Sequence, residues 1–143
     1  MPRRSSIAFL ALLLSAALLV LPVRANGPVG IAFVEAPEQS SGMCTGNNPD
    51  AAFACAREKC VAGGAEARDC LRVAWCYPAG WTADVFVQHK EGPHWHEYSC
   101  GWDSKETLHK AAAVKCDPAL RDYLMECAIV QIFDPQGNQI PVE

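Results

Sequence analysis

The spacing of the cysteines constrains the fold of this chain more than any other feature. Two sets of cysteines repeat nearly the same intervals, namely Cys44, Cys60 and Cys70, then Cys100, Cys116 and Cys127. The intervals are sixteen and ten residues in the first set and sixteen and eleven in the second. This pattern predicts a small unit that is present twice. The eight cysteines include no Cys-x-x-Cys pair, so a redox pair and a zinc knuckle are not indicated, and disulfide bonds are favoured.

The first 25 residues have the pattern of a secretory signal peptide. Arg3 and Arg4 precede an apolar run from Ile7 to Leu21, and Ala25 follows at a position that a signal peptidase can recognise. The apolar run is too short for a membrane-spanning helix. We therefore expect cleavage after Ala25 and a secreted or periplasmic mature protein that has no membrane span and is disulfide-bonded in an oxidising compartment.

Cleavage of the signal peptide changes the charge balance. The full sequence has a net charge of −4, whereas the mature chain keeps nine Lys and Arg residues against sixteen Asp and Glu residues, a formal charge of −7. An acidic surface repels phosphate backbones, so no nucleic-acid partner is expected. A cationic protein or a metal ion is the better match.

The mature chain divides into three parts. Residues 26–43 are rich in Gly, Pro and Ser, and we expect a flexible N-terminal arm in which residues 31–34 add at most an edge strand. Residues 44–134 hold the repeated unit and are expected to form one disulfide-rich, duplicated domain. Residues 135–143 are expected to form a C-terminal tail.

Local signals place two helices. Asn48 is a favourable N-cap, Pro49 suits the first helical position, and the glycines at 63–64 end the first helix. The second helix is expected to begin after Asp103 and to end before Pro118.

Alternating apolar residues predict strands over 70–76, 81–89, 94–100 and 127–133. The expected fold is α+β, with two strand-helix-strand repeats that form a mainly antiparallel sheet and place both helices on one face. The expected core comprises Phe53, Leu71, Val73, Leu108, Val114, Ile129 and Val130.

The cysteine pairing is expected to follow this fold. The end of each helix packs back on the next strand, and the remaining cysteines are taken to link more distant segments, although spacing does not determine the pairing. The favoured pairs are Cys60–Cys70, Cys116–Cys127, Cys55–Cys76 and Cys44–Cys100.

Three histidines of the central hairpin are candidate metal ligands. If the hairpin turns about Glu91 and Gly92, His89 lies opposite His94, and His96 follows on the same face. Three imidazoles of this kind suit zinc or copper. The alternative is that they border the core without binding a metal, and no other cofactor is expected.

The opposite face of the hairpin is a candidate surface for a protein partner. Trp95 and Glu97 are expected there, with Phe86 alongside. The tryptophans of this region could instead pack over the disulfides. No Gly-x-Ser-x-Gly, His-Glu-x-x-His or phosphate-binding glycine loop is present in the sequence, and we predict that the protein is not an enzyme.

Residues 44–134 resemble a bacterial family of exported proteins, the domain-of-unknown-function family numbered 4189. The matching stretches are residues 52–60 with 69–73 and residues 111–116 with 126–130, each an alanine-rich helix that ends in cysteine, followed by a strand that opens with cysteine. Cys44, Cys55 and Cys100 look like additions to the family pattern, and the usual closing cysteine has no counterpart near residue 133. The resemblance implies a compact sheet with two helices and an exported location, and it transfers no catalytic residues.

Together these features predict an exported, disulfide-stabilised binding module that engages a cationic extracytoplasmic protein. The alternative function is a secreted metal-binding protein that uses His89, His94 and His96.

Overall fold

The computed structural model describes residues 27–142, and the predicted signal peptide lies outside these residues. The elements, in chain order, are β1 (Gly30–Ala36), β2 (Ser40–Gly46), α1 (Pro49–Ala62), β3 (Leu71–Cys76), β4 (Trp81–His89), β5 (His94–Trp102), α2 (Lys105–Lys115), β6 (Leu124–Phe133) and β7 (Gln139–Ile140). Within residues 27–142, no helix is both long enough and apolar enough to cross a membrane.

The two halves of the chain arrange their elements in the same way. Each half runs through a hairpin, a helix and a further strand, and in each the first strand is central. One sheet has the order β2-β1-β3 and the other the order β5-β4-β6-β7, and all described pairings are antiparallel. The predicted α+β class with mainly antiparallel strands is therefore confirmed.

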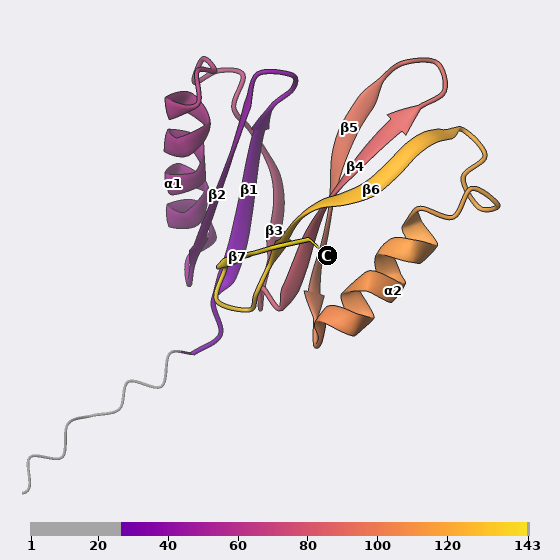
Figure 1. Ribbon diagram of the computed structural model, residues 1–143. Coiled ribbons are helices and arrows are strands. Elements are labelled where there is room, and N and C mark those ends of the chain that lie inside the picture. Colours follow the sequence, from indigo (N-terminus) through magenta and orange to yellow (C-terminus); the bar gives the residue numbers. More distant parts are fainter. Residues whose placement is uncertain (1–26, 143) are drawn as a thin grey trace, which may run out of the picture.

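Both helices were predicted to lie on one face of a single sheet, and this prediction was wrong. In Figure 1, α1 covers the outer face of the first sheet and α2 covers the outer face of the second, so the sheets lie between the helices. β3 pairs with β1 in the first sheet, and β4, the next strand along the chain, belongs to the second sheet. Three buried clusters follow from this arrangement, one under each helix and one between the sheets.

Helix α1 forms as the local signals predicted. The side chain of Asn48 accepts a hydrogen bond from the backbone N–H of Ala51, Pro49 is the first helical residue, and Gly63 caps the C-terminus. The face against the sheet consists of three small buried residues, Ala52, Ala56 and Cys60. Gly42 of β2 allows the close approach, because a Cβ atom at this position would lie 1.9 Å from the carbonyl oxygen of Ala56.

Helix α2 begins one residue later than predicted. Ser104, rather than Asp103, is the N-cap, and its side chain accepts a hydrogen bond from the backbone N–H of Thr107. Leu108 and Ala112 are buried on its inner side, where the cluster includes Val85, Val87 and Ile132 of the second sheet.

The segment that was expected to be a flexible arm forms part of the first sheet. β1 is its central strand, and Ile31, Phe33 and Val34 are at most 3% exposed. β2 and β3 flank β1 on both sides and satisfy its backbone hydrogen bonds. Part of the predicted tail is also paired, because β7 joins β6.

All eight cysteines form disulfides, which is typical of proteins in an oxidising, extracytoplasmic compartment. The pairs are Cys44–Cys55, Cys60–Cys70, Cys76–Cys100 and Cys116–Cys127. The second and fourth pairs were predicted, whereas the predicted pairs Cys44–Cys100 and Cys55–Cys76 were wrong. The reason is β2, which the sequence analysis did not predict: it carries Cys44 beneath α1, and the Cα atoms of Cys44 and Cys55 are 5.9 Å apart. The pair between Cys76 and Cys100 links the two halves.

The two sheets pack against each other at one end and separate at the other. Ile31, Phe33, Ala79 and Phe133 are buried between them. In Figure 1, the sheets diverge from this region towards the β1–β2 and β4–β5 turns. This divergence creates the space in which the candidate site lies.

Candidate functional site

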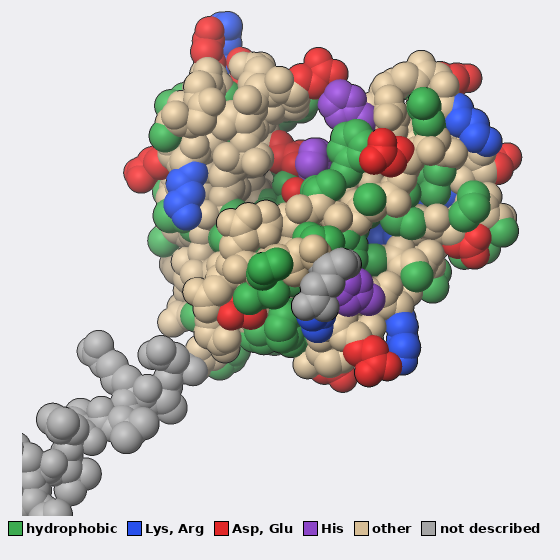
Figure 2. Space-filling view, in the orientation of Figure 1, with side chains coloured by type: hydrophobic (Ala, Val, Ile, Leu, Met, Phe, Trp, Pro, Cys, Tyr) green, Lys and Arg blue, Asp and Glu red, His purple; other side chains and the backbone are tan. Residues whose placement is uncertain are grey.

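A cleft lies between the β1–β2 hairpin and the beginning of β5. Residues 35–41 of the first sheet and 94–96 of the second line a cavity of about 390 Å³. Figure 2 shows a hollow between the two halves of the molecule, with histidine and acidic side chains near it. The size lies at the lower end of the range of small ligand sites, roughly 300–1,000 Å³.

The register of the β4–β5 hairpin decides which side chains face the cleft. Gln88 pairs with His94, and Phe86 pairs with His96, so these side chains share the inner face of the second sheet. His89 was predicted to lie opposite His94, and this prediction was wrong by one residue. Because side chains alternate along a strand, this one-residue shift puts His89 on the other face.

The three histidines therefore do not form the predicted metal site. The ring of His89 stacks on Tyr123, with 5.1 Å between the ring centroids, and its Nδ1 accepts a hydrogen bond from the backbone N–H of Glu91. Only His94 and His96 line the cleft. Across residues 27–142, no three His, Cys, Asp or Glu side chains gather in an arrangement that could hold a metal ion.

His96 is held in place by Asp84, the neighbouring inward-facing residue of β4. Its Nδ1 donates a hydrogen bond to Oδ1 of Asp84 over 2.7 Å. Burial raises the pKa of the Asp84 carboxyl, and the hydrogen bond and charge of His96 oppose this rise. The side chain of His96 is 36% exposed and that of Asp84 17%, so the imidazole lies on the solvent side of the pair.

Glu35 is held at the base of the cleft by an aromatic residue of the second sheet. The hydroxyl of Tyr98 donates a hydrogen bond to Oε1 of Glu35, and the Tyr98 ring stacks on Phe33 with 3.9 Å between the centroids. Burial, the hydrogen bond to Glu35 and the nearby carboxylates of Asp84 and Glu35 all raise the pKa of Tyr98. The tyrosine therefore stays protonated and continues to donate, and the Glu35 carboxylate has a fixed orientation.

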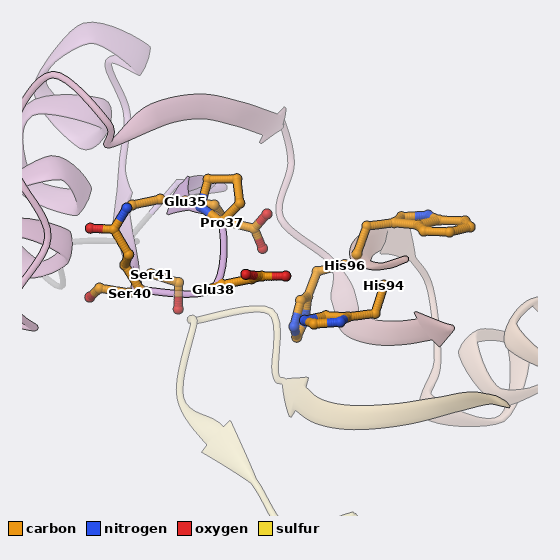
Figure 3. Close-up of a pocket in the computed structure, with 10 residues that line it drawn as sticks. Glu35, Pro37, Glu38, Ser40, Ser41, His94 and His96 are labelled. Carbon is orange, nitrogen blue, oxygen red and sulfur yellow. The ribbon is translucent and has the colours of Figure 1, made fainter. Parts of the chain in front are cut away.

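Glu38 lies at the tip of the β1–β2 turn with a left-handed backbone. Its φ is 59°, and it is the one residue other than glycine with a positive φ in the described part of the chain. The backbone N–H of Gln39 donates to the carbonyl of Ala36, which closes a four-residue turn with Pro37 and Glu38 at its centre. The second central position of such a turn favours glycine or asparagine. In Figure 3, the Glu38 carboxylate points across the cleft towards His94 and His96.

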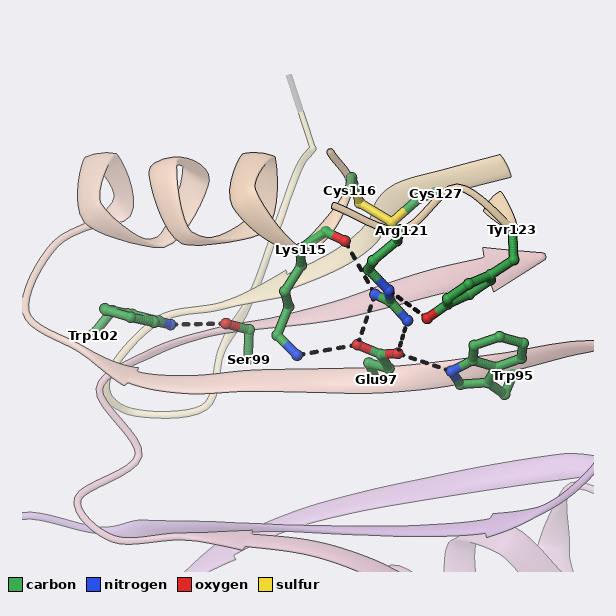
Figure 4. A network of polar contacts seen from close by, with 9 residues as sticks. All are labelled: Trp95, Glu97, Ser99, Trp102, Lys115, Cys116, Arg121, Tyr123 and Cys127. Atoms are coloured by element: carbon green, nitrogen blue, oxygen red, sulfur yellow. Dashed lines mark hydrogen bonds and ion pairs between the residues drawn. A yellow bond between two sulfur atoms is a disulfide. The ribbon is translucent and has the colours of Figure 1, made fainter. Parts of the chain in front are cut away.

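The predicted partner surface on the other side of the hairpin is covered by α2 and the turn that follows it. Oε1 of Glu97 accepts hydrogen bonds from Arg121 Nη2 at 2.6 Å and Trp95 Nε1 at 2.9 Å, and Lys115 Nζ lies 3.1 Å from Oε2 (Figure 4). Burial disfavours the charge of Glu97, but hydrogen bonds from Arg121, Trp95 and Lys115 outweigh it and lower its pKa to about 2.

This arrangement makes Glu97 part of an ion-pair network that joins α2 to β5. Phe86 does not lie alongside Trp95 and Glu97, as was predicted, but on the cleft side, where its ring contacts both His94 and His96. The predicted position of Phe86 was therefore on the wrong face of the hairpin.

Two residues of the cleft, Glu35 and Glu38, were missed by the sequence analysis. Both lie in the segment that was expected to be an arm, and their proximity to β5 depends on how the two sheets pack. The local signal that was available is the Pro37–Glu38 pair, which is compatible with a turn.

Comparisons with protein-family models, with curated proteins and with solved structures found no match to this chain. The resemblance to the family numbered 4189 therefore stays a prediction, and the function is argued from the geometry of the site.

Proposed function

We propose that this protein is an exported, disulfide-stabilised binding module that uses the inter-sheet cleft to engage a cationic group on an extracytoplasmic protein. The signal-peptide pattern, the four disulfides and the resemblance of residues 44–134 to an exported bacterial family support the location. The partner surface first suggested by Trp95 and Glu97 is replaced in this proposal by the opposite face of the same hairpin.

The observation that carries the proposal is the charge of the cleft lining. Among the residues at 35–41 and 94–96 that line the cavity, two are glutamates and none is Lys or Arg. The Glu35 carboxylate is oriented by Tyr98, and Glu38 occupies a backbone conformation that a glycine would adopt at lower energy. Unfavourable backbone geometry of this kind is concentrated at functional sites. A cationic partner fits this lining, and the mature chain's charge of −7 favours its approach.

The proposal is tested by binding of a fluorescent lysine- and arginine-rich decapeptide to the mature protein, measured by anisotropy at low and high salt. Glu38→Gln removes one charge from the cleft, and Glu58→Gln removes one charge from an exposed position of α1, so the two variants have the same net charge. We expect Glu38→Gln to weaken binding about five- to tenfold and Glu58→Gln to leave it nearly unchanged.

Equal effects of the two substitutions would overturn the proposal, because binding would then follow net charge rather than the cleft. An affinity that is the same at low and high salt would also contradict the proposal, since an exposed charge interaction is screened at high ionic strength.

A further inference from the structure

We propose that the cationic group bound by the cleft is a guanidinium, so that the protein recognises an arginine side chain of its partner in preference to a lysine. This inference rests on the proposed function and names the chemistry of the ligand. It follows from the shape of the two walls of the cleft rather than from its charge.

One wall is built from flat rings. His94 and His96 line the cleft, and Phe86 lies beside both, with ring centroids 5.6 Å and 5.8 Å away. His94 and His96 project from alternate positions of β5 on its inner face, and Phe86 pairs with His96 across the hairpin. A guanidinium is planar and weakly hydrated and stacks on such rings, whereas an ammonium is compact and strongly hydrated.

The other wall offers carboxylates that match the fork of a guanidinium. The orientation of Glu35 is fixed by the Tyr98 hydroxyl, and Glu38 points from the turn towards the rings (Figure 3). Parallel N–H donors of arginine bind a carboxylate in a bidentate manner, which an ammonium cannot reproduce. A planar cation between the two walls would stack on the rings of one wall and donate hydrogen bonds to the carboxylates of the other.

The ligand is expected to belong to a polypeptide because a second hollow adjoins the cleft. Ser41 lines both the cleft and a neighbouring space that is lined in part by Asp84, Tyr98 and Gln131. A cavity of about 390 Å³ accommodates one long side chain. The adjoining hollow offers room for part of the chain that carries this side chain.

Three peptides that differ at one central position test the inference. A glycine-rich pentapeptide carries arginine, lysine or citrulline, and citrulline keeps the planar shape of arginine without its charge. Titration followed by NMR is expected to show that the arginine peptide binds about fivefold more tightly than the lysine peptide. The citrulline peptide is expected to bind more weakly than both.

A ring-removal variant separates stacking from charge. His94 is exposed, and His94→Leu is expected to lower the arginine-to-lysine affinity ratio from about five to about two, because His96 and the carboxylates of the other wall remain. His109→Leu, on α2 and outside the cleft, is the matched control and should keep the ratio.

The outcomes distinguish the inference from the function on which it rests. Equal affinity of the wild-type protein for the arginine and lysine peptides, with both weakened by Glu38→Gln, would overturn the guanidinium preference and leave the cationic site in place. An unchanged ratio in His94→Leu would also overturn it. Failure of every cationic peptide to bind would overturn both proposals.

Discussion

Replacement of Glu38 by glycine is predicted to stabilise the fold while it removes binding. The φ of Glu38 is 59°, a left-handed conformation that disfavours residues with a Cβ atom by about 1–2 kcal/mol. Glycine adopts this conformation freely, but its greater freedom in the unfolded chain offsets about 0.5–1 kcal/mol of the gain. Glu38 is exposed, so little packing is lost with its side chain.

The net expectation is that Glu38→Gly raises the free energy of unfolding by about 0.5–1 kcal/mol, equivalent to a rise in Tm of about 2–5 °C for a domain of this size. Differential scanning calorimetry of the oxidised protein measures the stability, and anisotropy with the cationic decapeptide measures binding. The same substitution should weaken binding about five- to tenfold, because it deletes a carboxylate from the cleft.

Glu38→Ala is the control that separates the two effects. Alanine keeps the Cβ atom and hence the backbone strain, so it should lose binding without the gain in Tm. A Tm for Glu38→Gly at or below that of the wild type would refute the reasoning from backbone strain. Unchanged binding in both variants would refute a role for the carboxylate.

Further substitutions test the packing and electrostatics around the site. Gly42→Ala should lower the free energy of unfolding by about 1–3 kcal/mol, because its Cβ would meet the Ala56 carbonyl, whereas the Cβ of Gly46→Ala lies 3.6 Å from its nearest neighbour and should be tolerated in urea denaturation. Because the folded-state pKa of Glu97 is about 2, below its ordinary 4.5, its stabilising contribution is present above about pH 4.5 and is lost as the pH falls towards 2. Glu97→Gln should therefore reduce stability at pH 7 by about 2 kcal/mol and have little effect near pH 2 in thermal unfolding, and an equal deficit at both pH values would contradict this. Peptide mapping without reduction should recover the four bridges Cys44–Cys55, Cys60–Cys70, Cys76–Cys100 and Cys116–Cys127, and a bridge between Cys44 and Cys100 would contradict the fold.

The features predicted correctly from the sequence are those with local causes. The boundaries of α1 follow from Asn48, Pro49 and the glycines after it, and β4 was predicted over its full length, Trp81–His89. The start of α2 was predicted one residue too early because Asp103 and Ser104 can both cap a helix. The choice between them depends on which side chain reaches the N–H of Thr107, which the sequence does not specify.

The features that were missed depend on contacts between distant segments. β1 is central because β3, more than thirty residues later, pairs with it. Val73 and Val130 were assigned to the core, but each is an extra residue at an irregularity in strand pairing and is about half exposed. Strand alternation does not reveal such irregularities.

The cleft itself was not predictable from either half of the chain. Its acidic wall comes from the end of β1 and the turn after it, and its ring wall comes from β5. The length of the β4–β5 loop decides that His94 and His96 face inward while His89 does not. A change of one residue in that loop would exchange the two faces.

The central claim is that the inner surface between the two sheets is the binding site, and mapping of amide chemical shifts tests it most directly. On titration of the mature, oxidised protein with the arginine peptide, the largest shifts are predicted at residues 35–41 and 94–96. Shifts confined to the outer surfaces of α1 and α2, with these residues unchanged, would contradict the account.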